Sequence, residues 1–92
     1  MEPERRIKRH LATISILLKD RTNQAPLVNQ ILTDHGRLIV ARLGVNVQRR
    51  CIEHCTAIVT IIIDGTAKEI SALRKKLDES YGVVAKSNIL TK

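Results

Sequence analysis

Aromatic residues are almost absent from this sequence of 92 residues, which has no Trp, no Phe and one Tyr, Tyr81. Proteins that bind single-stranded nucleic acid stack bases on aromatic side chains, so this kind of binding is nearly excluded. The core must be built from aliphatic side chains, chiefly Ile, Leu and Val. No tract has a composition biased enough to indicate disorder, and the chain should fold.

Long apolar runs and abundant cysteines are also missing. No run approaches the ~20 residues that cross a bilayer, and residues 1–9 are charged, with no signal-type apolar segment behind them. Two cysteines, Cys51 and Cys55, do not make the disulfide framework of a small secreted domain. We therefore expect a cytoplasmic protein with reduced thiols and no membrane contact.

Motifs of catalysis are missing as well. The sequence has no nucleophile elbow, no phosphate-binding glycine loop and no pair of carboxylates on one predicted face. The four glycines lie at the ends of predicted elements or in turns. We expect no enzyme activity and no cofactor.

The length indicates one domain, residues 1–92, in which residues 1–8 form a flexible basic extension. The chain has 16 Lys and Arg against 9 Asp and Glu, a formal net charge of +7. A domain of this size buries only about 60–65% of its unfolded surface, so burial against a partner subunit would add stability.

Hydrophobic periodicity divides the first half into a strand, a helix and a second strand. Residues 10–18 alternate with a period of two, which is typical of a strand with one apolar face. Residues 20–23 favour turns and helix caps, Thr22 or Asn23 can cap a helix, and Pro26 suits its first turn. Gly36 would end this helix in the left-handed conformation. Residues 37–47 alternate again, with the apolar side chains of positions 39, 41, 43, 45 and 47 toward the core.

The second half repeats the order from a β-branched strand. Residues 56–63 predict this strand, and Thr66 and Glu69 have the spacing of a capping box at the start of a second helix. That helix presents an apolar stripe and ends at Gly82, before a last strand over residues 83–90. The stripe consists of Ile70, Leu73, Leu77 and Tyr81.

The order strand, helix, strand, strand, helix, strand predicts an α+β, ferredoxin-like βαββαβ fold, a four-stranded antiparallel sheet with two helices on one face. The opposite face has no cover within the chain and carries too many apolar residues for water. We expect a homo-oligomer, in which a second copy stacks on this face or extends the sheet at an edge.

A small-molecule site is predicted where the first strand meets the first helix. Asp20, Thr22 and Asn23 could bind a polar group there, together with free amides at the helix start. Arg42 is predicted to project away from the core, two residues before Gly44, which leaves room for a ligand. The structural alternative is that these residues only cap a helix, contact solvent and mark a bulge.

A metal-responsive or nucleic-acid-associated regulator is the alternative function. Cys51, His54 and Cys55 form the one cluster with metal-ligand chemistry, although an extended strand would separate the two cysteines by ~13 Å. Cys55 as a small core residue is the simpler interpretation, and we expect no metal site. The basic groups are dispersed along the chain, so contact with nucleic acid stays open.

The βαββαβ order, the segment Lys19-Asp20-Arg21 and the segment Arg42-Leu43-Gly44 resemble the ACT-like iron-only hydrogenase system regulators, over residues 10–90. The resemblance implies a self-associating protein, dimer or tetramer, with a transcription-related regulatory role and no catalysis. ACT domains hold amino acids or similar effectors near the first strand–helix loop, where Asp20, Thr22 and Asn23 lie here. The architecture is also similar to the C-terminal domain of the nickel-responsive repressor, whose metal-binding histidines and cysteine have no matching set here.

Overall fold

The computed structural model describes residues 8–47 and 55–91 of the chain. The predicted extension therefore lies outside the described residues, apart from Lys8. The elements follow the predicted order. They are β1 (Arg9–Leu18), α1 (Arg21–Asp34), the short 3-10 helix η2 (Gly36–Leu38), β2 (Ile39–Asn46), β3 (Ala57–Thr66), α2 (Ala67–Asp78) and β4 (Val83–Ile89).

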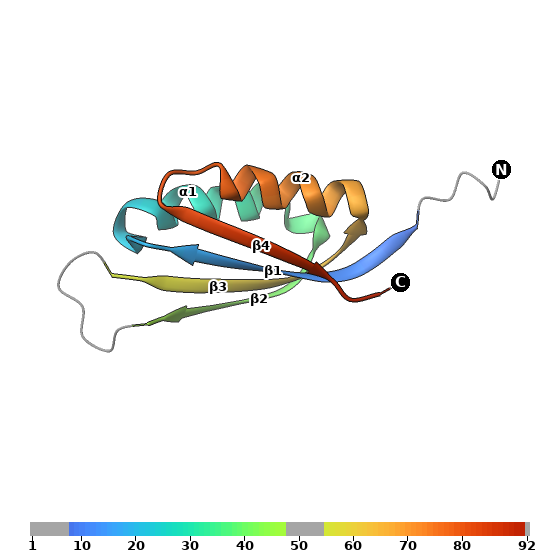
Figure 1. Cartoon of the computed structure of the whole chain (residues 1–92), viewed down its shortest axis with the longest axis horizontal. Helices are drawn as coiled ribbons and strands as arrows, with labels where there is room; N and C mark the ends of the chain where they lie inside the picture. The colour runs from blue at the N-terminus through green and yellow to red at the C-terminus, as the bar shows by residue number, and fades with distance from the viewer. Residues whose placement is uncertain (1–7, 48–54, 92) are drawn as a thin grey trace.

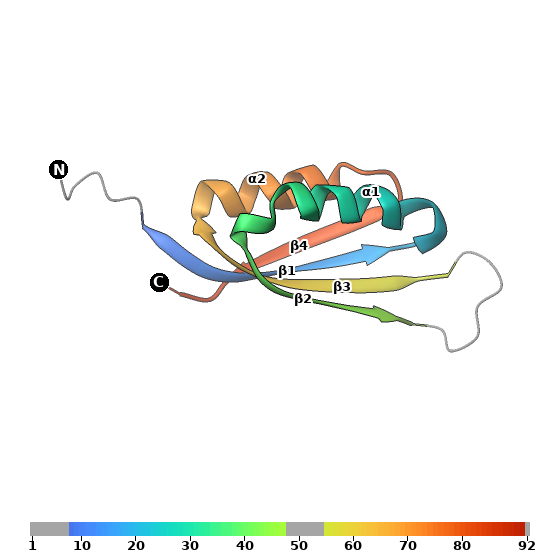
Figure 2. The same cartoon turned by 180° about the vertical axis from the view of Figure 1, so that it is seen from behind.

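The four strands form one antiparallel sheet in the order β2-β3-β1-β4, so the first and third strands are central. Both helices cover the same face of this sheet (Figures 1 and 2). The predicted α+β, ferredoxin-like fold is confirmed. The opposite face, called the open face below, has no helix over it.

The core lies between the sheet and the helices and is entirely aliphatic. From Ala12 onward, every second residue of β1 is buried, and each helix contributes three further buried side chains. A fully buried Leu or Ile side chain stabilises the fold by about 1.5–3 kcal/mol. These residues are Ala12, Ile14, Ile16 and Leu18 of β1, Val28, Ile31 and Leu32 of α1, and Ile70, Leu73 and Leu77 of α2.

The start of α2 is as predicted. The Thr66 hydroxyl accepts a hydrogen bond from the Glu69 amide at 3.1 Å, and the Glu69 carboxylate accepts one from the Thr66 amide at 2.9 Å. Gly82 has a φ of +75°, the left-handed conformation expected after a helix. Tyr81, however, is not part of the buried stripe, because α2 ends at Asp78 and the tyrosine is 94% exposed in the following turn.

The first helix starts and ends differently from the prediction. Asp20, rather than Thr22 or Asn23, is the N-cap residue, so Pro26 is the sixth residue of α1 instead of lying in its first turn. The Pro26 ring removes the donor to the Thr22 carbonyl, and both residues are exposed to water. Gly36 does not adopt a positive φ but begins η2.

A β-bulge in β2 reverses the predicted orientation of that strand. Ile39 pairs with Ile63 whereas Ala41 pairs with Ile62, so Val40 is an extra residue in the ladder. A shift of one residue moves every following side chain to the opposite face. Arg42, opposite buried Ile61, thus lies on the helix side, and the predicted inward orientation of positions 41, 43 and 45 is wrong.

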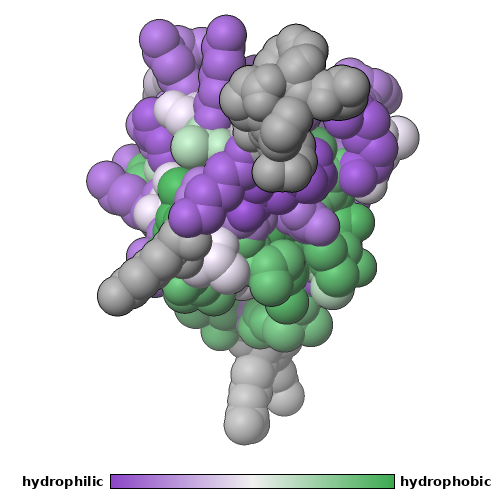
Figure 3. Space-filling model, turned by 90° about the vertical axis from the view of Figure 1, so that its right-hand side faces the viewer, coloured by the Kyte–Doolittle hydropathy of each residue, from purple (hydrophilic) through white to green (hydrophobic). Residues whose placement is uncertain are grey.

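The open face is consequently more apolar than the sequence pattern predicts. Leu43 and Val45 join residues of β1 and β3 on it, with Leu43 67% exposed. Figure 3 shows green, hydrophobic side chains gathered over the lower part of the molecule, on the side of the sheet, and purple side chains over the helices. The exposed large apolar side chains of this face are Leu11, Leu43, Val45, Ile58 and Ile62.

Candidate functional site

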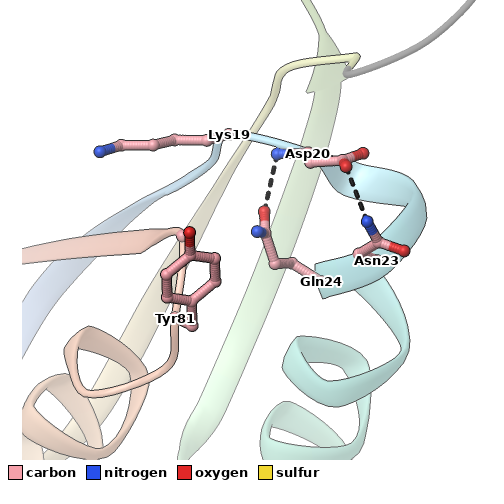
Figure 4. Close-up of a pocket in the computed structure, with 6 residues that line it drawn as sticks. Lys19, Asp20, Asn23, Gln24 and Tyr81 are labelled. Carbon is pink, nitrogen blue, oxygen red and sulfur yellow. Dashed lines mark hydrogen bonds between the residues drawn. The ribbon is translucent and has the colours of Figure 1, made fainter.

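A cavity of about 480 Å³ opens at the predicted strand–helix junction. It lies between the end of β1, the first turn of α1 and the turn that joins α2 to β4 (Figure 4). We call it the junction cavity. Its lining residues are Lys19, Asp20, Asn23, Gln24, Tyr81 and Gly82.

Backbone hydrogen bonds hold the two walls of the junction cavity together. The Lys19 amide donates to the Gly82 carbonyl at 3.0 Å, which ties the end of β1 to the turn before β4. The Arg21 amide donates to the Cys55 carbonyl at 2.8 Å, which ties the start of α1 to the segment before β3. The cavity is therefore bounded by a fixed backbone.

Side-chain hydrogen bonds orient the polar groups on the helix wall. The Gln24 side-chain carbonyl accepts from the Asp20 amide, and the Asn23 side-chain amide donates to the Asp20 carboxylate, each at 2.7 Å (Figure 4). The Gln24 amide nitrogen also packs closely on Gly82, where it would overlap the Cβ of any other residue. These contacts fix the Asn23 and Gln24 side chains against the wall.

A positive charge is available at this cavity. The Lys19 ammonium makes no ion pair or hydrogen bond within the part of the chain that the structure describes. By contrast, most of the backbone amides at the start of α1, which were predicted to be free, already donate hydrogen bonds. Those of Asn23 and Gln24 donate to the Asp20 carbonyl at 3.1 and 3.0 Å, and that of Arg21 to Cys55. Lys19 is thus the group best placed to bind an anion.

The structure brings together only two of the five predicted site residues. Asp20 and Asn23 line the junction cavity, whereas Thr22 is exposed on α1 outside it. Arg42 and Gly44 lie on the edge strand β2. The Arg42 guanidinium donates to the Asn29 side chain at 2.8 Å, and Gly44 faces Val59. The expectation that Arg42 projects away from the core was wrong, because the bulge precedes it.

Four lining residues were missed by the sequence reasoning: Lys19, Gln24, Tyr81 and Gly82. Lys19 lies directly beside the predicted Asp20 and could have been included on that ground. The spacing of Tyr81 alone predicts that it belongs to the buried stripe of α2. Gln24 has no sequence signal of its own, because its role depends on contact with a turn more than fifty residues away.

The alternative metal centre receives no support from the described residues. Within them, no three His, Cys, Asp or Glu side chains gather around a common point. Cys51 and His54 lie outside the described residues. Cys55 is buried, as the simpler interpretation held, but it is disulfide-bonded, so the expectation of a reduced thiol is wrong for this residue. That expectation came from the small number of cysteines, which does not exclude a single disulfide.

The basic side chains are spread over several elements and do not indicate one binding surface. Lysines and arginines occur on every element of the sheet except β3 and on both helices, and several of them form ion pairs with neighbouring carboxylates. Arg5, Arg6, Arg49 and Arg50 lie outside the described residues. None of the helices within 8–47 and 55–91 has the length and apolar character to span a bilayer.

The ferredoxin-like fold is similar to the folds of two solved PII-like proteins. A protein described as a "putative PII-like signaling protein", TTHA0516 from Thermus thermophilus, has a TM-score of 0.66 at 11% identity, over 91% of each chain. The nitrogen regulatory PII-like protein CPII from Thiomonas intermedia K12, solved with ADP, AMP and bicarbonate, has a TM-score of 0.54 at 15% identity, over 92% of this chain and 93% of CPII.

The chain belongs to the TM1266-like family, described as "Iron-only hydrogenase system regulator, putative", whose model matches residues 10–87. The uncharacterized protein TM1266 from Thermotoga maritima is 25% identical, with a TM-score of 0.78 over 91% of this chain and 100% of that protein. The family that the sequence resembled is therefore confirmed. No curated protein matches the chain.

Proposed function

We propose that this protein is a self-associating regulatory protein without catalytic activity that senses a small polar ligand in the junction cavity. The family description supports a regulatory role. The observation that carries the proposal is the cavity itself. It combines the Lys19 ammonium with side chains that are held in place on a fixed backbone. Polar groups that are held before the ligand arrives lose little entropy on binding.

The lining suits a ligand with a negative group and a hydrogen-bonding part. Lys19 would pair with a carboxylate or phosphate. The Asn23 side-chain carbonyl oxygen would accept a hydrogen bond from an amino group, and the hydrogens of the Gln24 side-chain amide would bind an acceptor of the ligand. An amino acid meets these requirements. Because CPII was solved with ADP, AMP and bicarbonate, adenine nucleotides and bicarbonate belong in the same test.

Isothermal titration calorimetry with the standard amino acids, AMP, ADP and bicarbonate tests the sensing role. We expect at least one compound to bind. Lys19→Gln and Asn23→Ala should each weaken its binding about tenfold or more, because each removes a hydrogen bond worth about 1.5–3 kcal/mol to a charged ligand.

Two variants serve as matched controls for this titration. Lys68→Gln removes the same charge from an exposed position of α2. Arg42→Ala removes the arginine that the sequence predicted as part of the site, but that contacts Asn29 instead. Both should bind like the wild type. A protein that binds none of the compounds, or one that loses binding with Arg42→Ala but retains it with Lys19→Gln, would contradict the proposed site.

A further inference from the structure

We propose that the open face is the surface on which a second copy of this chain docks, and that the junction cavity and this interface influence each other. The first part goes beyond the proposed function because it names the interface. The second part, which concerns regulation, rests on the ligand site proposed above.

The strand register places one continuous apolar row across the open face. Val45 pairs with Ile58, Ile58 with Leu17, and Leu17 with Val84, so the row includes all four strands. The next row has small side chains at its centre, where Thr60 pairs with Ser15. A hollow of about 280 Å³ lies beside the apolar row, and we call it the sheet hollow. Its lining residues are Ser15, Ile16, Leu17, Ile58, Val84 and Lys86.

The shape of the open face is complementary to the open face of a second copy. Two sheets that pack face to face interdigitate the side chains of their inner faces at a separation of about 10 Å. A two-fold axis presents the same patch on both partners, so the apolar row of one copy can enter the sheet hollow of the other. Each large side chain of the row then meets the small Ser15 and Thr60 of its partner.

The distribution of charge also favours a second copy of the chain as the partner of the open face. The chain carries a net charge of +7, which opposes the approach of an identical chain on most sides. The charged side chains that alternate onto the open face within the described strands are Arg9, Asp64 and Lys86. Arg9 and Asp64 pair with each other at 3.0 Å, which leaves Lys86 as the one uncompensated charge. Two open faces can therefore meet with little repulsion, whereas the lysines on the helix side would oppose contact there.

The size of the face limits the interface to a small one. Four strands at about 4.8 Å spacing and about seven residues at ~3.3 Å each cover a footprint of roughly 19 by 23 Å. This footprint of roughly 440 Å², enlarged somewhat by the corrugation of the side chains, corresponds to an interface smaller than the standard one, in which each partner buries ~800 Å². A second sheet of the same dimensions covers it.

The apolar row ends next to the junction cavity. Leu17 precedes Lys19 by two residues, and Val84 follows Gly82 by two. The hydrogen bond from the Lys19 amide to the Gly82 carbonyl joins the same two chain segments directly beyond the row. A ligand held by Lys19 would thus fix the strand ends that carry Leu17 and Val84, and docking would in turn fix the wall of the cavity.

Sedimentation velocity of a charged variant tests the interface. Ile58→Glu places a carboxylate in the apolar row at a position that is already 41% exposed, so the variant should stay folded by circular dichroism. Leu27→Glu, at an exposed apolar residue of α1, is the matched control. We expect the wild type and Leu27→Glu to sediment as dimers or larger species. Ile58→Glu should associate at least about tenfold more weakly.

A cross-linking experiment keeps the proposal testable if Ile58→Glu fails to fold. Ser15→Cys should form an intermolecular disulfide on mild oxidation, because Ser15 lies at the centre of the face. Ser71→Cys, exposed on α2, should form none. A wild type that is monomeric at high concentration, an Ile58→Glu that associates like the wild type, or cross-linking at Ser71→Cys alone would overturn the proposal.

Sedimentation repeated with the calorimetric panel separates this inference from the proposed function. If an amino acid, AMP, ADP or bicarbonate binds, it should change the dimer dissociation constant, and the monomeric Ile58→Glu should bind it more weakly. Binding by a monomeric wild type would overturn the interface and leave the ligand site standing. Association without binding by any compound would overturn the ligand site and leave the interface. Binding that leaves association unchanged would overturn the coupling.

Discussion

Gly36 and Gly82 both follow a helix, but their surroundings make very different demands on the side chain. Gly82 has a φ of +75°, and a Cβ there would overlap the Gln24 amide nitrogen. Gly36 has no positive φ, and no atom lies within 4 Å of the place that its Cβ would take. The sequence predicted the left-handed conformation for both, because the residue type alone does not reveal whether a 3-10 turn follows the helix.

Substitution of these two glycines by alanine should therefore have unequal effects. Gly82→Ala should lower the free energy of unfolding by about 2 kcal/mol, from left-handed strain and the displacement of Gln24. Gly36→Ala should stay within about 0.5 kcal/mol of the wild type. Urea denaturation followed by circular dichroism measures both, and equal losses would contradict this account of the turn.

Glu69 gives the protein a pH-dependent contribution at the start of α2. The Thr66 backbone amide, which donates to its carboxylate, is the main cause that lowers the pKa of Glu69 below 4.5, and the Thr66 hydroxyl, Arg37 and Arg9 act in the same direction. Because the pKa of Glu69 is lower in the folded state, its ionised form stabilises the fold at pH values above the pKa that it has in the unfolded chain. This contribution is lost as the pH falls through the folded value.

The variant Glu69→Gln isolates that charge, because glutamine can still accept the backbone hydrogen bond of the capping box. It should be less stable than the wild type at pH 7, and the difference should shrink as the pH falls below the pKa that Glu69 has in the unfolded chain and disappear below its lower pKa in the folded state. Denaturation midpoints measured across this range test the prediction. Glu79→Gln, at the exposed end of α2, provides the control. A difference that persists in acid would show that the charge is not the cause.

At the scale of elements, the two helices begin with different chemistry. The Thr66 hydroxyl caps α2 by accepting from the Glu69 amide. The Asp20 side chain makes no capping bond to the α1 backbone, and its carboxylate instead accepts from the Asn23 side chain. The first turn of α1 thus contributes its polar side chains to the junction cavity rather than to its own stability.

Threonine substitutions at the two helix starts should reflect this difference. Thr66→Ala should cost about 1 kcal/mol of unfolding free energy, the usual value for a lost cap. Thr22→Ala should change it by less than about 0.5 kcal/mol, since alanine is a better helix former and Thr22 is exposed. Thermal denaturation distinguishes the two. A larger loss of unfolding free energy for Thr22→Ala than for Thr66→Ala would indicate that Thr22 caps α1.

Local sequence signals predicted the elements well and their orientation less well. The alternation of β1, the stripe of α2 as far as Leu77 and the Thr66–Glu69 capping box each depend on neighbours in sequence, and the structure confirms them. The bulge at Val40 has no comparable signal, because both faces of β2 carry apolar residues. The same limit applies to the site. Asp20 and Asn23 were found near a helix start, whereas Tyr81 enters through a turn whose position only the packing fixes.

At the scale of the whole molecule, charge and apolar surface are separated. The lysines of α2 lie on the helix side, while the described strands leave only Lys86 uncompensated on the open face. Association through a nearly uncharged apolar surface has to overcome the general repulsion between chains of charge +7. The two contributions respond to salt in a predictable way.

Added salt should therefore strengthen self-association, because it screens the repulsion and does not weaken apolar contacts. Sedimentation at low and at high sodium chloride concentration measures this effect. A dimer that dissociates as salt is added would indicate an interface held by ion pairs, and would contradict docking through the open face.

The central claim is that the uncovered face of the sheet makes this protein a self-associating one. Sedimentation equilibrium of the wild-type chain over a wide range of concentrations tests it most directly, without any ligand or substitution. The account predicts a reversible assembly whose mass at high concentration is at least twice that of the 10.3 kDa chain. A single species with the mass of one chain at every concentration would contradict it.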